Sequence, residues 1–170
     1  EMEALRPTLR AEADTMLAAW PAQSNDASLP IAERVAAHRG ELLRNAPPSD
    51  KAVDRTIPGP AGPIRVRTMV PDTVDAVFLH IHGGGFVAGA PEMTDILHEI
   101  LIATLNLAFV SVDYRLAPEH PYPAGPDDCE AVGVWLLEHA QAEFGASRLL
   151  IGGESAGAEA PPSKPTTAKG

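Results

Sequence analysis

The chain has 170 residues, of which 45% are hydrophobic, and this length and composition predict one globular domain with a sizeable core. Its formal net charge is -10 at pH 7, which argues against nucleic acid or an anionic membrane as a partner, because both require a basic face. The one cysteine, Cys129, excludes an intrachain disulfide.

The first 46 residues are predicted to form two amphipathic helices. Residues 2–20 and 29–44 carry apolar side chains near helical spacing. Pro21 ends the first pattern and Pro47-Pro48 follows the second. Because an apolar helical stripe needs a surface to cover, we expect this pair either to pack on the following domain or to cap its site.

From residue 51 the pattern changes to that of strands. Residues 53–57 and 64–70 alternate apolar and polar side chains around a Pro- and Gly-rich turn, which predicts a hairpin at a sheet edge. Further apolar runs predict buried strands at 76–81, 108–112 and 149–151, with helices between them at 93–105 and 127–144. This alternation predicts a parallel sheet with right-handed crossovers.

Three consecutive glycines follow the predicted strand that ends at Ile81, in the segment His82–Phe86. Their backbone N–H groups are not covered by side chains, so the loop can hold an oxyanion between two donors. A flexible loop and a phosphate-binding nest are the alternatives. A phosphate loop would have a following Lys-Ser/Thr or a GxGxxG spacing, and neither is present.

The segment Gly153–Gly157 follows the last predicted strand and matches the Gly-x-Ser-x-Gly nucleophile elbow. Its glycines remove the Cβ atoms that would collide in so tight a turn. Ser155 would then lie at a helix N-terminus, where N–H groups point at a developing anion. For an isolated match, a strand followed by a Gly-rich turn is the favoured interpretation. The elbow and the His82–Phe86 loop together, in this order, are far more specific.

A third stretch, Asp113–Ala124, completes a set of motifs. With it the chain resembles the hormone-sensitive-lipase-like (type IV) esterases and lipases over residues 1–158. The resemblance implies an α/β-hydrolase fold, with a mostly parallel sheet, flanking helices and an N-terminal helical cap, truncated at the C-terminus. It implies a cap at 1–46 and a partial core at 47–158. For the Pro-rich tail, 159–170, we expect no packed structure.

The resemblance also implies roles for individual residues. Ser155 would be the nucleophile that attacks a small-molecule ester, without a metal or cofactor. The oxyanion hole would be formed by the N–H groups of Gly84, Gly85 and Ala156. The residues that would support the two motifs are His82, Gly83, Gly153 and Gly157. The Asp113–Ala124 segment would buttress the site without taking part in the chemistry.

The catalytic triad departs from the family pattern. In this fold the chain order is Ser, then Asp or Glu, then His. No Asp and no His follows Gly157, and the only acid there is Glu159. All six histidines lie upstream, and His120 is the least implausible recruit among them. The triad Asp and His are therefore not present, and we expect the chain alone to be inactive.

Three functions stay open on the sequence alone. The first is a serine carboxylic-ester hydrolase scaffold, and the second is a non-catalytic binding or interaction protein on the same scaffold. The third, a nucleotide-binding domain that uses the triple glycine, is disfavoured by the elbow. Without an apolar run long enough to span a bilayer and without signal-peptide features in residues 1–6, we expect a cytoplasmic location. The sequence leaves the oligomeric state open.

Overall fold

The structure is a computed structural model that describes residues 28–159. The chain divides into two compact units, residues 1–38 and 39–170. The predicted helix at 29–44 is confirmed as α2, Ile31–Arg44. The predicted helix at 2–20 lies outside the described residues, as does all but the first residue of the predicted tail. The predicted boundary between a cap and a core at residue 46 stays a prediction.

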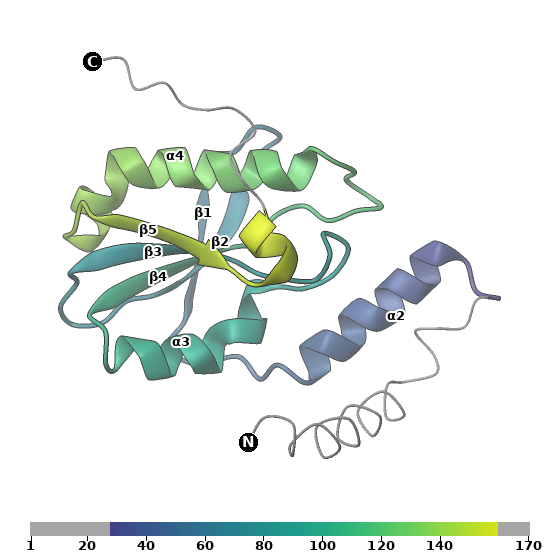
Figure 1. Cartoon of the computed structure of the whole chain (residues 1–170), viewed down its shortest axis with the longest axis horizontal. Coiled ribbons are helices and arrows are strands. Elements are labelled where there is room, and N and C mark those ends of the chain that lie inside the picture. The colour runs from purple at the N-terminus through teal and green to yellow at the C-terminus, as the bar shows by residue number, and fades with distance from the viewer. Residues whose placement is uncertain (1–27, 160–170) are drawn as a thin grey trace, which may run out of the picture. The chain divides into compact units, whose positions relative to one another are not determined.

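A five-stranded sheet, in the order β1-β2-β4-β3-β5, organises the second unit (Figure 1). The strands are β1 Val53–Ile57, β2 Ile64–Met69, β3 Ala76–Ile81, β4 Leu107–Val112 and β5 Leu149–Gly153. β1 and β2 form the predicted hairpin at the sheet edge, and β2 is antiparallel to β4. β3 is parallel to both β4 and β5, so the predicted parallel sheet is formed by these three strands.

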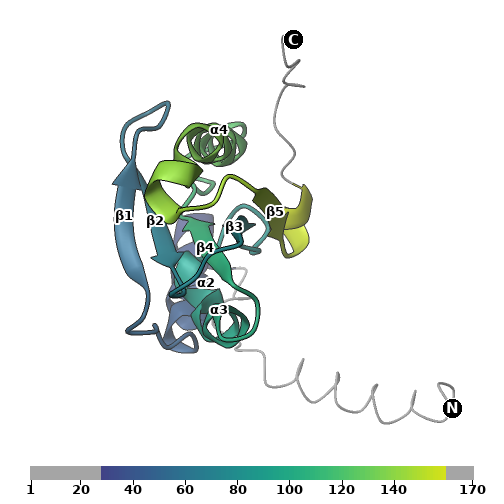
Figure 2. The same ribbon diagram turned by 90° about the vertical axis from the view of Figure 1, so that its left-hand side faces the viewer.

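Two crossover connections cover opposite faces of the sheet (Figures 1 and 2). A 3₁₀ turn, η2 Pro91–Thr94, and helix α3, Asp95–Ile102, join β3 to β4. Helix α4, Ala124–Phe144, joins β4 to β5. It begins three residues before the predicted start, because Pro126 lies in its first turn, where the missing N–H would have no helical partner.

The apolar core lies between the sheet and α4. Successive side chains of a strand point to opposite faces, and one set from β3 and β4 packs against α4 in a single buried cluster. The members of this cluster from these three elements are Val77, Leu79, Ile81, Ala108, Val110, Val112, Cys129, Val132, Leu136, Ala140 and Phe144. The other face carries aromatic and polar side chains, with Phe109 of β4 stacked on His98 of α3 at 4.2 Å.

A buried ion pair attaches α3 to the sheet. Asp95, only 1% exposed, accepts a hydrogen bond from Nη2 of Arg67 at 2.6 Å. It also accepts one from the backbone N–H of Ser49 at 2.8 Å. The hydrogen bond with Asp95 raises the pKa of Arg67. The first residue of α3 is thus held by an ion pair and hydrogen bonds.

Candidate active site

Ser155 lies where β5 ends and a 3₁₀ turn, η3 Ser155–Glu159, begins (Figure 1). Its φ angle is 52°, in the left-handed region that residues other than glycine seldom occupy. The residue is exposed, whereas Ala156 directly after it is buried. A strained backbone that presents an exposed serine at a strand-to-helix turn is the geometry of a nucleophile elbow.

The two glycines of the elbow lie against the end of β3. A Cβ atom on Gly153 would collide with the carbonyl oxygen of Ile81. A Cβ atom on Gly157 would collide with the same oxygen and come within 2.9 Å of the carbonyl oxygen of His82. The turn can therefore approach β3 this closely only because both positions lack a side chain.

The loop after β3 brings the triple glycine to the elbow. Gly83 lies so close that a Cβ atom there would be 3.0 Å from the carbonyl oxygen of Glu154. Gly84 and Gly85 have φ angles of 122° and 64°. A side chain on Gly84 would also collide with the carbonyl oxygen of Ala88. The two motifs lie about seventy positions apart in the chain but are neighbours in the fold. The reason is that β3 and β5 are adjacent parallel strands, so the loops after them begin at the same edge of the sheet.

His82 is a buried residue that contacts the backbone of this loop. It is 1% exposed, and its Nδ1 lies 2.8 Å from the carbonyl oxygen of Gly83. Because a carbonyl oxygen only accepts, Nδ1 carries the proton. Burial lowers the pKa of His82, which favours the neutral ring. Tyr114 stacks on this ring at 4.2 Å, and its hydroxyl donates to the His82 carbonyl oxygen at 2.8 Å.

The Asp113–Ala124 segment is tied to its surroundings at several points. Arg115 donates from its backbone N–H and its Nε to Asp128, which is 2% exposed. The backbone N–H of Ala117 donates to the carbonyl oxygen of Phe86 at 2.9 Å, which links the segment to the glycine loop. These contacts fit a buttress without a chemical role. Tyr114 and Asp128 were not singled out as functional from the sequence.

Sequence reasoning also missed a pair beneath the elbow. Nε2 of His80 lies 2.9 Å from Oε1 of Glu154, and its Nδ1 lies 3.2 Å from Oγ of Ser111. The one signal in the sequence is that His80 interrupts an apolar run. A polar side chain in a buried strand needs a partner, but the sequence does not say which.

Among residues 28–159, no histidine hydrogen-bonds to the hydroxyl of Ser155. His120 is exposed in the loop before α4. Within the same residues, no group of three His, Cys, Asp or Glu side chains is placed to hold a metal ion. No helix in this part of the chain is long and apolar enough to cross a membrane.

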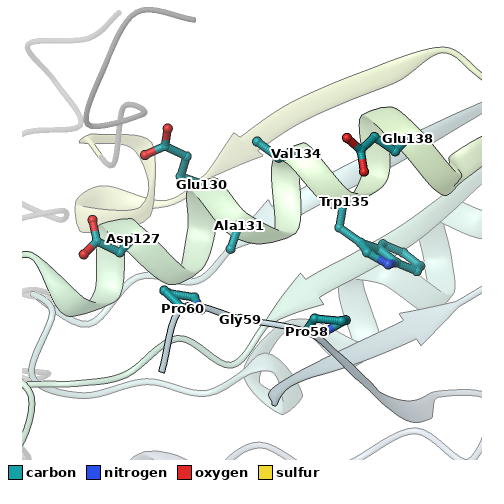
Figure 3. Close-up of a pocket in the computed structure, with 9 residues that line it drawn as sticks. All are labelled: Pro58, Gly59, Pro60, Asp127, Glu130, Ala131, Val134, Trp135 and Glu138. Carbon is teal, nitrogen blue, oxygen red and sulfur yellow. The ribbon is translucent and has the colours of Figure 1, made fainter. Parts of the chain in front are cut away.

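The hollows lined by described residues include the following two. One, of about 240 Å³, borders the elbow and is lined by Phe78, His80, Leu97, His98, Leu101, Leu105, Leu107, Phe109, Gly153 and Glu154. The other, of about 580 Å³, lies between the β1–β2 turn and α4, where Trp135 extends toward the turn (Figure 3). Its lining residues are Pro58, Gly59, Pro60, Asp127, Glu130, Ala131, Val134, Trp135 and Glu138. None of the predicted site residues is among them.

Comparisons with known proteins point to one group. The family described as alpha/beta hydrolase fold matches residues 78–160. The chain is 44% identical over 108 residues to the carboxylic ester hydrolase LipN of Mycobacterium tuberculosis, covering 61% of this chain and 29% of that protein. It is 42% identical over 129 residues to esterase LipI of the same organism, covering 69% and 40%.

Solved structures give the same result. An esterase from Pyrobaculum calidifontis aligns with a TM-score of 0.63 at 33% identity, covering 72% of this chain and 44% of that one. The ester-hydrolase EH1AB1 from the metagenome of Lake Arreo aligns with a TM-score of 0.69 at 32% identity, covering 89% and 50%. The chain thus spans half or less of the length of each of these proteins.

Proposed function

Because the chain belongs to the hormone-sensitive-lipase-like (type IV) family of α/β-hydrolase esterases and lipases and matches their N-terminal portion, we propose that it carries the nucleophile and oxyanion hole of a serine carboxylic-ester hydrolase. The observation that carries the proposal is the backbone of Ser155. Its φ angle of 52° presents an exposed hydroxyl beside the glycine loop. A sheet that packs well does not need such strain, which is typical of functional sites.

In this reaction Ser155 attacks the carbonyl carbon of a small-molecule ester. The N–H groups of Gly84, Gly85 and Ala156 hold the oxyanion of the tetrahedral intermediate. The residues that let these groups approach one another are His82, Gly83, Gly153 and Gly157. The proposal includes a cap at residues 1–46, of which residues 1–27 lie outside the described part of the chain, and a core at residues 47–158 that carries the site.

Among the described residues, no histidine hydrogen-bonds to the hydroxyl of Ser155, so none of them is in place as its general base. We therefore expect the 170-residue chain on its own to hydrolyse esters negligibly. An oxyanion hole without a base leaves roughly 10³–10⁴-fold acceleration over water. The non-catalytic and the nucleotide-binding alternatives have no observation of their own and are not retained.

A phosphonate ester is the probe that separates nucleophile from base. The serine oxygen displaces the alkoxide or phenoxide leaving group from phosphorus and its proton passes to water. The phosphonylated serine is stable, so slow labelling of the chain is detectable by intact mass and by peptide mapping. We expect labelling on Ser155 and none in Ser155→Ala. Gly84→Ala should slow it, because the new methyl group collides with the carbonyl oxygen of Ala88 and displaces an oxyanion donor.

Gly62→Ala is the matched control for Gly84→Ala. Gly62 also has a positive φ, 126°, but lies in the β1–β2 turn with open space around it. Equal labelling rates in the two variants would contradict the oxyanion assignment, and labelling that survives Ser155→Ala would contradict the nucleophile. Ester hydrolysis at ordinary esterase turnover, abolished by Ser155→Ala, would show that these 170 residues contain a base.

A further inference from the structure

His80 is the fifth of the six residues of β3, at the end of the strand next to the elbow. It is 3% exposed and interrupts an otherwise apolar strand. The parallel pairing of β3 with β5 places it opposite Gly152, two residues before Glu154. Pairing with β4 places it opposite Ser111. The register of the sheet thus brings a buried imidazole between a hydroxyl on one side and the elbow on the other.

The hydrogen-bonding groups of Glu154 and Ser111 indicate which nitrogen of the His80 ring carries the proton. An ionised carboxylate only accepts, so Nε2, 2.9 Å from Oε1 of Glu154, carries hydrogen. Nδ1 can then accept from the hydroxyl of Ser111 at 3.2 Å. A single tautomer satisfies both contacts. The arrangement leaves no polar atom of the buried ring without a partner, which is what burial of an imidazole requires.

Aromatic contacts hold the ring on a third side. The ring of His98 meets it edge-on at 4.5 Å and is itself stacked on Phe109. Burial, and to a smaller extent the nearby His80, lowers the pKa of His98 to about 3. His98 therefore brings no charge at neutral pH. Of the residues that line the adjoining hollow, Glu154 is the one with an acidic side chain.

Glu154 transmits this contact to the site through its backbone. Its carbonyl oxygen accepts the N–H of Gly157 at 2.9 Å and lies against Gly83 of the glycine loop. The next residue is Ser155, in its left-handed conformation. A rotation of Glu154 would move the nucleophile and disturb the approach of the loop.

The charge of Glu154 bears on the same site. Burial raises the pKa of Tyr114, whose hydroxyl supports the glycine loop, and the nearby Glu154 carboxylate adds to this to a smaller extent. A carboxylate one residue from the nucleophile opposes the negative charge that develops in an oxyanion hole. A hydrogen bond donated to that carboxylate reduces its electrostatic repulsion of the oxyanion.

We propose that His80 is a positioning residue of the nucleophile elbow: its Nε2–H holds the Glu154 carboxylate, fixes the peptide that enters Ser155 and offsets the charge beside the oxyanion hole. The role in ester hydrolysis rests on the function proposed above. The hydrogen bond and its effect on the elbow do not, so the two can fail separately.

Two substitutions at His80 distinguish the contact of its ring with Glu154 from the contact with Ser111. In His80→Gln the side-chain amide reaches about as far as Nε2, so it can still donate to Glu154. In His80→Asn the shorter amide corresponds to Nδ1 and keeps only the contact with Ser111. Both variants are polar and smaller than histidine, so a difference between them reports the Glu154 contact. His139→Gln, on α4 with its ring stacked on Trp135, is the control away from the elbow.

The first readout is hydrogen–deuterium exchange of the peptide that spans residues 149–159 in the full chain. We expect His80→Asn to lose roughly tenfold or more in protection there, because a hydrogen bond to a charged group is removed. His80→Gln and His139→Gln should stay near the wild type. Equal protection in the Asn and Gln variants overturns the inference, including the case in which the segment is unprotected in every protein.

The second readout is the rate at which a phosphonate ester labels Ser155. We expect labelling to slow in His80→Asn and to recover in His80→Gln. If the wild type is not labelled but protection changes as expected, the proposed function fails and the positioning contact stands. If labelling proceeds equally in all variants, His80 does not position the nucleophile, whatever the exchange data give. Nitrogen NMR of the wild-type ring should show the proton on Nε2, and a proton on Nδ1 alone would also overturn the assignment.

Discussion

The two faces of the sheet are covered by different kinds of side chain. The buried residues of α4 include the apolar side chains of Val132, Leu136 and Phe144, whereas the two buried residues of α3, Asp95 and His98, are polar. α4 packs into the apolar cluster, and α3 begins at a buried ion pair and stacks His98 on the sheet. One face is held by hydrophobic burial over a wide area, and the other by a few directional contacts.

The candidate site lies between these two kinds of packing. The glycine loop is supported from the α4 face, where Tyr114 belongs to the apolar cluster. The elbow is supported from the α3 face by His80 and Glu154. It follows β5, a sheet edge among the described strands, where Ile151 is 63% exposed. The glycine loop is therefore better covered than the turn that carries Ser155.

The largest effect should come from breaking the ion pair on the α3 face. Asp95→Ala leaves Arg67, 9% exposed, without its main partner, and removing one member of a buried pair costs about 3–5 kcal/mol. Urea unfolding followed by circular dichroism measures the loss. Glu119→Ala, which removes an exposed partner of Arg39, should cost much less, because solvent screens the pair. A similar loss in both variants would show that α3 is not held by the buried charge pair.

Truncating apolar side chains to alanine should show directly how much unfolding free energy each face contributes. Leu136→Ala should cost about 2–5 kcal/mol, because the residue has no exposed surface and its removal leaves a cavity. Leu137→Ala is the matched control in the same helix, with 72% of the residue exposed, and should stay within about 0.5 kcal/mol. Leu97→Ala on the α3 face should fall between them. An effect at Leu97 equal to that at Leu136 would mean that the α3 face is as well packed in solution.

The last effect expected is a gradual one, a pH dependence of stability that belongs to the α3 face. The pKa of His98 is lowered from 6.5 to about 3, so the unfolded chain takes up a proton there before the folded one does. Stability is then complete above pH 6.5 and falls as the pH drops, by up to about 1.4 kcal/mol per pH unit. Burial lowers the pKa of His82 as well, so His82 also reduces the stability of the fold as the pH drops.

The measurement is the unfolding free energy between pH 6.5 and 4.5. Below that window the lowered carboxyl pKa values of Asp54, Glu92, Glu99 and Glu119 add their own loss of stability. His98→Phe should reduce the slope, because it can keep the stacking on Phe109 without a titrating ring. His120→Gln, at an exposed position, should leave the slope unchanged. An unaltered slope in His98→Phe would show that the buried ring is not its source.

Much of the architecture could be predicted from local patterns. The alternation in residues 53–57 and 64–70 predicted the hairpin, and the apolar runs predicted the three parallel strands, because side-chain period is a local property of a strand. The helix boundaries were less accurate. Residues 93–94 belong to a 3₁₀ turn, and α3 ends at Ile102 before the predicted end at 105.

By itself the sequence determined the order of the two glycine motifs and the strands that carry them. It did so because glycine spacing and apolar runs act over a few residues. Only the tertiary structure decided that β3 lies between β4 and β5, that His80 meets Glu154, and that Arg67 meets Asp95. These pairings depend on the register between segments far apart in the chain, and a shift of one residue would turn each side chain to the opposite face of the sheet.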